Sequence, residues 1–197
     1  MLRMNFVQPV REGEAIRAIK GALKEKSPRN FLLWVLGTNT GLRISDLLKL
    51  KVKDVQDRKG NIKDSLDITE QKTKRQKNIE INPEAKFALE YFFKKTGIYD
   101  LDEYLFKDTR KGKEHINKPI SRVRAWQMIN DWAREAGIKT KIGTHTLRKT
   151  YGHQAHQAGI DIIYISEALG HRNIETTRRY LGITQDDVKK AFKNFTV

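Results

Sequence analysis

The chain of 197 residues contains no cysteine, so it forms no disulfide bond and offers no thiolate to a metal. It also has no apolar run of the ~18 residues that a transmembrane helix needs. Its start does not read as a secretory signal peptide. The chain carries no internal repeat and no low-complexity tract. These absences lead us to expect a cytoplasmic protein with no membrane partner.

Several catalytic signatures are missing as well. The sequence has neither a Walker A motif nor the Rossmann glycine pattern, which argues against nucleotide hydrolysis. It has no G-x-S-x-G elbow. His145, His153 and His156 are close in sequence, but no carboxylate stands at a ligand spacing beside them. We therefore expect neither a bound metal nor a cofactor.

Positive charge is what the sequence has in excess. It contains 39 Lys and Arg against 24 Asp and Glu, a net charge of +15, which indicates a polyanionic partner. A protein that is merely soluble and basic is the alternative. Hydrophobic residues make up 38% of the chain, enough for the core of one domain of ordinary size. The run Phe31–Leu36 is apolar on every side and predicts the central helix of that core.

The last third of the chain, residues 143–182, concentrates candidate catalytic side chains. Thr144 is a good N-cap for a helix that runs from His145 to about Ala158. At ~100° per residue, Arg148 falls on the same stripe of this helix as His145. That stripe starts at a helix N-terminus, where unpaired N–H groups and the helix dipole favour a phosphate.

Two shorter helices are expected to follow. One begins at Asp161 and stops at Gly170, which places His171 in a tight turn. The next begins near Ile174 and carries Tyr180. Phosphodiester chemistry needs a hydroxyl that attacks phosphorus, fixed positive charge and groups that move protons. Four side chains of this region supply them: His145, Arg148, His171 and Tyr180.

The order and spacing of these residues resembles the signature of the tyrosine recombinases, also called phage-type integrases. H-x-x-R ends at Arg148, L-G-H ends at His171, and Tyr180 follows nine residues later. The resemblance covers residues 11–196. It implies the tyrosine recombinase catalytic-domain fold, mainly α-helical with a small antiparallel β-sheet (α+β). It also implies that Tyr180 is the nucleophile.

A second arginine motif supports the same resemblance. The stretch T-G-L-R-I-S-D-L is similar to the first arginine box of the family, so Arg43 matches its catalytic arginine and Asp46 its supporting acidic residue. Ser45 is expected to cap a short helix, with Arg43 just outside its N-terminus. The planar guanidinium of Arg43 suits two phosphoryl oxygens better than an ammonium does.

Residues 62–81 alternate like two strands joined by a basic turn. Family members carry a catalytic lysine on this hairpin, so the resemblance makes Lys72 the general acid, with Lys74 as the second choice. The turn also provides candidates for contact with the DNA backbone, which are Lys74, Arg75 and Lys77.

Residues 107–118 have no apolar period and form an expected exposed loop, which either grips phosphate or is simply mobile. Its DNA-backbone candidates are Arg110, Lys111 and Lys113. Ser121 is expected to cap the next helix. On that helix Val123, Trp126, Ile129 and Trp132 are spaced as a core face.

The resemblance also implies an architecture. Residues 1–10 are expected to be a linker or lead-in, and residues 11–197 the catalytic domain. The N-terminal DNA-clamping domain of most family members is expected to be absent. Either an excised catalytic domain or a short member, like the fimbrial inversion recombinases, accounts for this. The amphipathic stretch 185–195 either folds back on its own domain or docks on the next subunit.

The function implied by the resemblance is site-specific recombination or integration of a phage or mobile element, with double-stranded DNA as the partner. Strands are cleaved and rejoined through a 3′-phosphotyrosine intermediate without metal or ATP. The alternatives are a nicking-closing enzyme like type IB topoisomerases and a catalytically idle DNA-binding module. By analogy with the family we expect a homotetramer on paired DNA sites, a monomer in its absence, and association with the nucleoid.

Overall fold

The computed structural model describes residues 7–110, 112 and 116–193. The elements in this part of the chain follow one another in the order α1 (Gly13–Lys26), α2 (Pro28–Thr40), α3 (Ile44–Leu47), α4 (Val52–Val55), β1 (Ser65–Thr69), β2 (Gln76–Glu80), α5 (Pro83–Thr96), α6 (Arg122–Glu135), α7 (Thr146–Gln157), α8 (Ile162–Ala168), α9 (Ile174–Leu181) and α10 (Gln185–Lys193).

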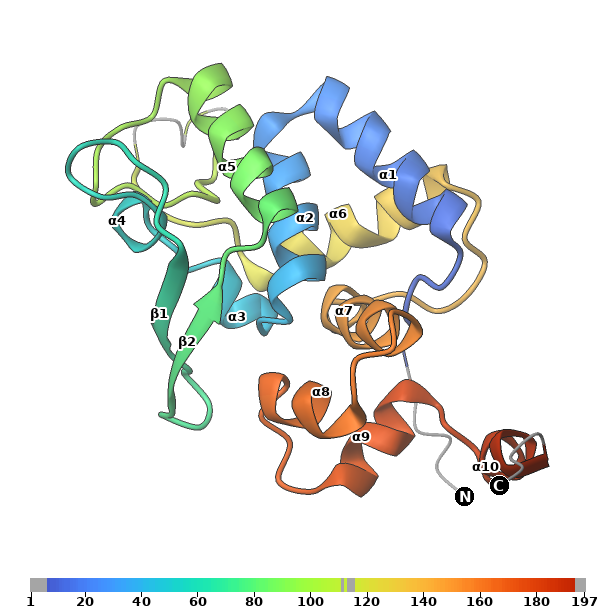
Figure 1. Ribbon diagram of the computed structural model, residues 1–197. Helices are drawn as coiled ribbons and strands as arrows, with labels where there is room; N and C mark the ends of the chain where they lie inside the picture. The colour runs from blue at the N-terminus through green and yellow to red at the C-terminus, as the bar shows by residue number, and fades with distance from the viewer. Residues whose placement is uncertain (1–6, 111, 113–115, 194–197) are drawn as a thin grey trace.

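Helix α2 is the centre of the fold, and α1, α5 and α7 pack around it (Figure 1). Its residues Phe31–Leu36 are each at most 1% exposed. Because burial of one large apolar side chain contributes about 1.5–3 kcal/mol, this run anchors the core. Ser27 caps the helix by accepting a hydrogen bond from the Asn30 amide, and Pro28 takes the first turn. The prediction of a central helix here is confirmed.

Strands β1 and β2 form an antiparallel hairpin, in which Leu66 faces Ile79 and Ile68 faces Lys77. Leu66 is fully buried and fixes the hairpin to the helical body. The fold is therefore mainly α-helical with a small two-stranded antiparallel sheet, as the sequence predicts.

The buried apolar side chains of the described residues form two clusters, which lie on either side of α7. The larger cluster surrounds α2 and includes Leu147 of α7. The smaller one joins α7, α8 and α9 through Ala155, Ile165, Leu169 and Leu181. In Figure 1, α8 and α9 accordingly lie on the far side of α7 from α2. Side chains at the start of α7 therefore stand at the junction of the two clusters.

The predicted core face of α6 was wrong in two positions. Val123 is 66% exposed and Trp126 is 49% exposed. The buried stripe of α6 instead includes Ala125 and Ala133, whose small side chains let the helix approach its neighbours closely. The predicted face rests on bulky residues alone and leaves out the alanines, so it is rotated around the helix from the face that the structure buries.

Two predicted helix caps were also wrong. Helix α7 begins at Thr146 with His145 in the N-cap position, and the Thr144 side chain caps nothing. The Thr146 hydroxyl ties the helix start to the lead-in instead, donating to the Gln8 carbonyl and accepting from the Gly143 amide. Ser45 lies inside α3, and Arg43 occupies its N-cap position without a side-chain cap.

The two ends of the described chain differ in how they meet the body. Val10, in the irregular lead-in, is 1% exposed, and its amide donates to the Thr150 hydroxyl over 2.9 Å. Helix α10 projects away from the rest of the molecule (Figure 1). Within the described ranges, every helix is too short or too polar to cross a membrane.

Candidate active site

Arg148 is the structural centre of the candidate site. Its side chain is buried at 4% exposure. The guanidinium donates one hydrogen bond to the Gly41 carbonyl over 2.5 Å and another to the Leu169 carbonyl. The first carbonyl follows α2 and the second ends α8, so Arg148 bridges the two apolar clusters. Its position is fixed by the protein before any ligand binds.

Gly41 makes room for the Tyr151 ring next to the carbonyl that binds Arg148. Its φ is +62°, and a Cβ built on it would lie 2.6 Å from the Tyr151 ring. Only glycine both adopts this left-handed conformation without strain and leaves room for the ring. The T-G-L-R motif therefore contributes two groups to the site, the Arg43 side chain and the Gly41 carbonyl that holds Arg148.

Replacing Gly41 with alanine is expected to lower the free energy of unfolding by at least about 2 kcal/mol, because backbone strain and a ring clash add. Urea denaturation of the purified variant measures this. Gly97→Ala is the matched control, since Gly97 also has a left-handed φ of +64° but nothing within 4 Å of a new Cβ. Equal losses in the two variants would contradict the clash.

Arg43 stands at the start of α3 and forms an ion pair of 2.5 Å with Glu70, whose side chain is 1% exposed. Lys77 of β2 faces the same carboxylate, with its Nζ 3.3 Å from Oε1. The Lys77 ammonium also donates to the Ala168 carbonyl at the end of α8 over 2.8 Å. Glu70 therefore joins the first arginine box to the hairpin, and Lys77 joins the hairpin to the end of α8.

Asp46 fixes the hairpin turn to α3. Its Oδ1 accepts a hydrogen bond from the Gln71 amide over 3.1 Å, and its side chain is 4% exposed. The Gln71 side chain donates to the Ser45 carbonyl over 2.9 Å. Lys72 follows directly, so Asp46 sets where the turn that carries Lys72 leaves the body.

Tyr180 and His171 lie against each other across the α8–α9 turn. Their ring centroids are 5.0 Å apart, with the rings at 71°. His171 Nδ1 is 2.9 Å from the hydroxyl of Thr177, which is fully buried and so fixes the imidazole. The Lys149 ammonium lies 5.0 Å from the centre of the Tyr180 ring. Among the described residues, no group meets the Tyr180 hydroxyl with hydrogen-bond geometry.

Burial and positive charge set the protonation states here. Burial lowers the pKa of His171 to about 4, and the charges of Arg148, Arg43 and Lys77 act in the same direction. Burial raises the pKa of Tyr180 to about 12, although Arg148 and Arg43 oppose it. Near neutral pH the imidazole is therefore neutral and the phenol is protonated.

His145 is exposed at the start of α7. Partial burial of its ring lowers its pKa, and the charges of Arg148, Arg122, Arg43 and Lys149 lower it further. The site thus brings Arg43, His145, Arg148, His171 and Tyr180 into one electrostatic environment.

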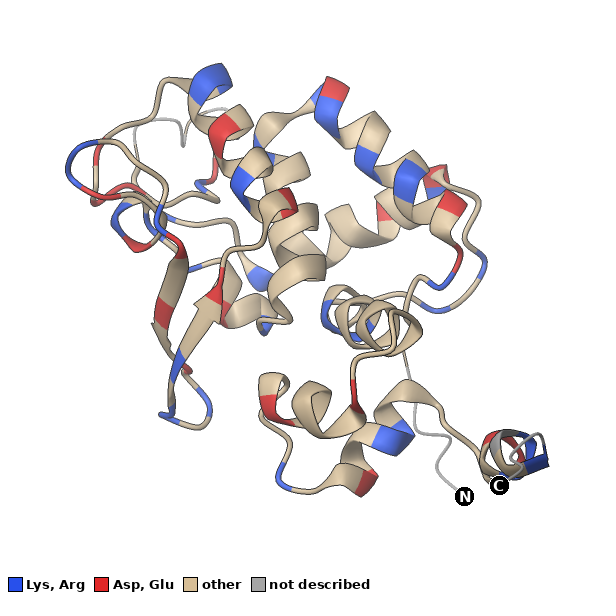
Figure 2. Ribbon diagram, viewed as in Figure 1, with Lys and Arg blue, Asp and Glu red and all other residues tan. Residues whose placement is uncertain are grey.

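The basic residues of the hairpin fall into two groups: some are exposed in the turn, and one faces the candidate site. Lys72, Lys74 and Arg75 are exposed in the turn, which Figure 2 shows as a basic tip below β1 and β2. In the part of the chain that the structure describes, the Lys72 side chain makes no hydrogen bond or ion pair. Lys77, which the sequence suggested as a backbone contact, faces inward to Glu70 and is 15% exposed in its side chain.

Of the basic loop candidates, Arg110 is exposed but pairs with Asp108 over 2.5 Å. Lys111 and Lys113 lie outside the described residues. Sequence reasoning missed Glu70 altogether. The signal that could have found it is a lone carboxylate two residues before Lys72 in an otherwise basic turn.

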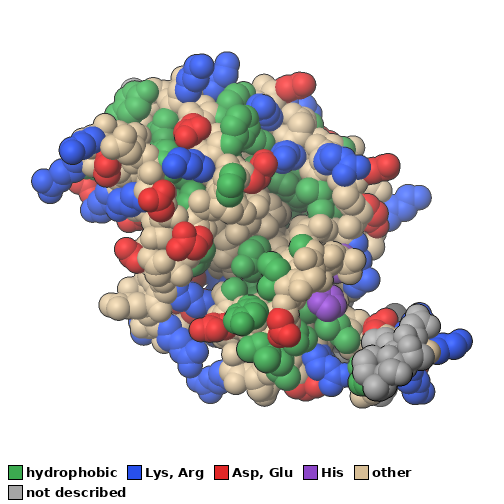
Figure 3. Space-filling model, in the orientation of Figure 1, with side chains coloured by type: hydrophobic (Ala, Val, Ile, Leu, Met, Phe, Trp, Pro, Cys, Tyr) green, Lys and Arg blue, Asp and Glu red, His purple; other side chains and the backbone are tan. Residues whose placement is uncertain are grey.

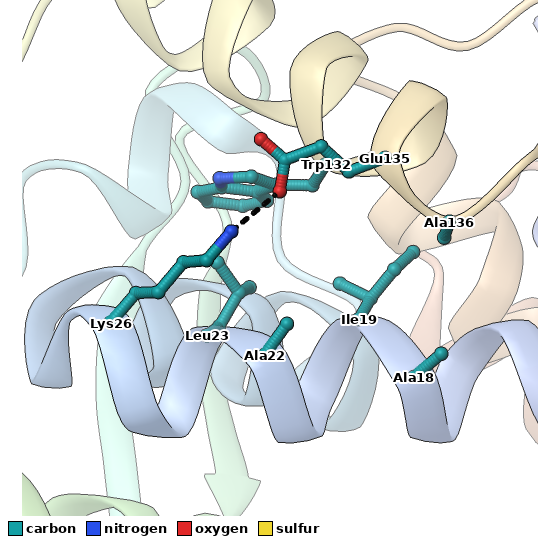
Figure 4. Close-up of a pocket in the computed structure, with 8 residues that line it drawn as sticks. All are labelled: Ala18, Ile19, Ala22, Leu23, Lys26, Trp132, Glu135 and Ala136. Atoms are coloured by element: carbon teal, nitrogen blue, oxygen red, sulfur yellow. Dashed lines mark hydrogen bonds and ion pairs between the residues drawn. The ribbon is translucent and has the colours of Figure 1, made fainter.

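A separate pocket between α1 and α6 has a different character (Figure 4). Its walls are mainly apolar, including Ile19, Leu23 and Trp132, and the Lys26 ammonium pairs with Glu135 over 3.0 Å at its edge. None of the predicted catalytic residues lines this pocket, so it adds nothing to the candidate site.

Fold and site together define a helical domain in which two arginines, two histidines and a tyrosine gather at the junction of two cores. The model of the phage integrase family matches residues 11–186. The chain belongs to this family, the tyrosine recombinases, whose members are enzymes that transfer DNA strands.

Individual relatives agree with this. The probable integrase/recombinase YoeC of Bacillus subtilis is 40% identical over 192 residues, 98% of each chain. The tyrosine recombinase XerA of Pyrococcus furiosus is 31% identical over 180 residues, which are 90% of this chain but 58% of XerA. The crystal structure of XerA recombinase superposes with a TM-score of 0.73 over 94% of this chain and 65% of that chain; at 24% identity this is a likeness of fold.

Proposed function

We propose that this chain cleaves and rejoins double-stranded DNA site-specifically, with Tyr180 as the nucleophile that forms a 3′-phosphotyrosine. The observation that carries the proposal is the buried Tyr180 hydroxyl beside His171 and within the field of Arg148 and Arg43. The net charge of +15 suits a DNA partner. Membership of the recombinase family favours this function over a topoisomerase or an idle DNA-binding module.

In the proposed reaction, Arg43 and Arg148 hold the non-bridging oxygens of the scissile phosphate. Arg148 is already fixed by two carbonyls, so it stabilises charge that develops on phosphorus without reorganising. His171, neutral near pH 7 because its pKa is about 4, serves as a hydrogen-bonding group rather than a cation.

Proton transfer completes the step. The Tyr180 phenol has a pKa of about 12, so it must lose its proton as it attacks phosphorus. His145 takes or returns a proton, and Lys72 protonates the departing 5′ oxygen. Because the phosphotyrosine keeps the free energy of the phosphodiester, a 5′-hydroxyl can rejoin the strand without ATP. Exchange of partner strands at this stage gives recombination.

A trapping experiment on randomised DNA tests the proposal with no target sequence chosen in advance. The protein is incubated with nicked duplexes of randomised sequence, from which the short 5′-hydroxyl fragment diffuses away after cleavage. We expect a covalent adduct on the peptide that contains Tyr180, identified by mass analysis, and the recovered DNA gives the site. An adduct on another residue, or none on any duplex, would contradict the proposal.

Assembly on paired DNA sites as a homotetramer is part of the proposal, with a monomer in the absence of DNA. Helix α10 projects from the body, with Val188 and Phe192 on one face. Apolar side chains gather over the α8–α9 region in Figure 3. A pocket there is lined by Ile160, Ile162 and Ile183. We propose that α10 of a neighbouring subunit docks in this pocket.

Phe192→Ser should therefore lower the amount of tetramer on paired sites by roughly 10-fold or more, since a buried aromatic anchor dominates such a contact. Mass photometry of the DNA complexes measures it. Lys193→Ser on the same helix is the control, because its exposed side chain lies off the apolar face. Equal tetramer yields from the two variants would contradict the docking of α10 through Phe192 on a neighbouring subunit.

A further inference from the structure

Glu70 is a buried carboxylate that the proposed reaction leaves without a role. Its side chain is 1% exposed, although it lies at the edge of an exposed basic turn. Its carboxylate meets the Arg43 guanidinium at 2.5 Å and the Lys77 ammonium at 3.3 Å, and it accepts a hydrogen bond from the Thr73 hydroxyl. Burial of an unpaired charge is costly, so these partners are what keep the carboxylate inside.

The carboxylate is ionised. Burial by itself raises the pKa of Glu70, but contacts with Arg43 and Thr73 and the positive charge of Lys77 outweigh burial and lower it to about 2. Near neutral pH, Glu70 therefore carries a full negative charge between two cations of the site, with the charge of Arg148 also acting on it.

The partners of Glu70 come from separate parts of the fold. Arg43 begins α3, Thr73 lies in the turn that carries Lys72, and Lys77 belongs to β2. The backbone of Glu70 also closes that turn, because its amide donates to the Arg75 carbonyl and its carbonyl accepts from the Lys74 amide. One residue thus joins the first arginine to both ends of the hairpin turn.

By holding these cationic side chains in place, Glu70 lowers the entropy cost of binding a phosphate. Long basic side chains lose rotamer entropy when a phosphate fixes them, and groups already held in place avoid this cost during the reaction. With three cations, Arg43, Arg148 and Lys77, against one carboxylate, the cluster still keeps net positive charge for a phosphate.

We propose that Glu70 is a positioning residue, which holds Arg43, Lys77 and the turn that carries Lys72 in the arrangement that the DNA phosphate meets. This inference rests on the proposed function. It predicts that loss of the Glu70 charge slows strand cleavage without weakening DNA binding, because the buried side chain offers DNA almost no surface and its neutralisation removes a negative charge.

The test uses Glu70→Gln in the full chain, with the nicked duplex recovered from the trapping experiment. We expect DNA affinity equal to or tighter than that of the wild type, and adduct formation at saturating protein at least about 10-fold slower. Glu80→Gln makes the same charge change at an exposed position of β2 and should cleave at the wild-type rate.

Several results would overturn the inference. Wild-type or faster cleavage by Glu70→Gln would overturn the inference and make Glu70 a bystander or a competitor of the phosphate. Weakened DNA binding at an unchanged cleavage rate would overturn it too. If Glu70→Gln shows no cooperative thermal transition, Thr73→Val decides. It removes one hydrogen-bond donor to the carboxylate and keeps the charge of Glu70, so slower cleavage supports the inference and a wild-type rate overturns it. Failure of the wild type to form any adduct would instead overturn the proposed function, and this inference with it.

Discussion

Tyr180→Phe is expected to abolish the covalent protein–DNA adduct on a nicked duplex while it leaves DNA binding largely intact. The substitution removes the only atom that attacks phosphorus in the proposed reaction, so adduct formation should fall by at least about 10⁴-fold. Denaturing gel electrophoresis of the trapped reaction measures the adduct, and a gel shift measures binding. A persistent adduct in the variant would show that another residue is the nucleophile.

The same variant has a second expected result that does not depend on DNA. The Tyr180 hydroxyl is shielded from solvent; the Arg148 guanidinium interacts with it electrostatically, but no described residue meets it with good hydrogen-bond geometry. Removing a buried, unsatisfied hydroxyl costs little or stabilises the fold. The midpoint of thermal unfolding should therefore stay equal or rise. Tyr164→Phe, on an exposed tyrosine of α8, is the control and should change neither the adduct nor the midpoint.

Arg148→Lys is expected to cost both activity and stability. An ammonium replaces a planar guanidinium that serves the Gly41 and Leu169 carbonyls, and it reaches only one of them. The abandoned buried carbonyl should cost about 1–3 kcal/mol of unfolding free energy. Loss of a preorganised donor to the phosphate should slow cleavage by about 10²–10³-fold.

Urea denaturation and single-turnover adduct formation measure the two effects of Arg148→Lys separately. Arg179→Lys is the matched control, because the Arg179 side chain on α9 is 75% exposed and its one ion pair among the described residues is with Glu175 at the surface. If Arg148→Lys behaves like Arg179→Lys in both measurements, the two carbonyl contacts do not fix the site.

Local signals made much of the last third readable from sequence. Asp161 caps α8 by accepting from the Ile163 amide, and Gly170 ends that segment with a φ of +59°. Such signals act within one turn of helix, so they are present in the sequence itself. They suffice to place His171 in a turn and Tyr180 on the following helix, as the structure has them.

Three features of the site came only from tertiary structure. Glu70 and Lys77 face inward because Arg43 and the end of α8 lie beside them; the lone carboxylate in the basic turn could have drawn attention to Glu70, but it does not reveal these partners. The anchor of Arg148 on Gly41 spans 107 residues of sequence. The raised pKa of Tyr180, about 12, follows from burial between α7, α8 and α9 rather than from any neighbour in sequence.

The sequence by itself determined which side chains this protein brings to phosphodiester chemistry, because the motif spacing and the helix signals that carry them are local. It determined the mainly helical class for the same reason. Only the tertiary structure decided which carboxylates and carbonyls bind the cationic side chains of the site, because these partners come from elements far apart in the chain. Burial and the nearby charges, which together set the pKa values described here, exist only once those elements have packed.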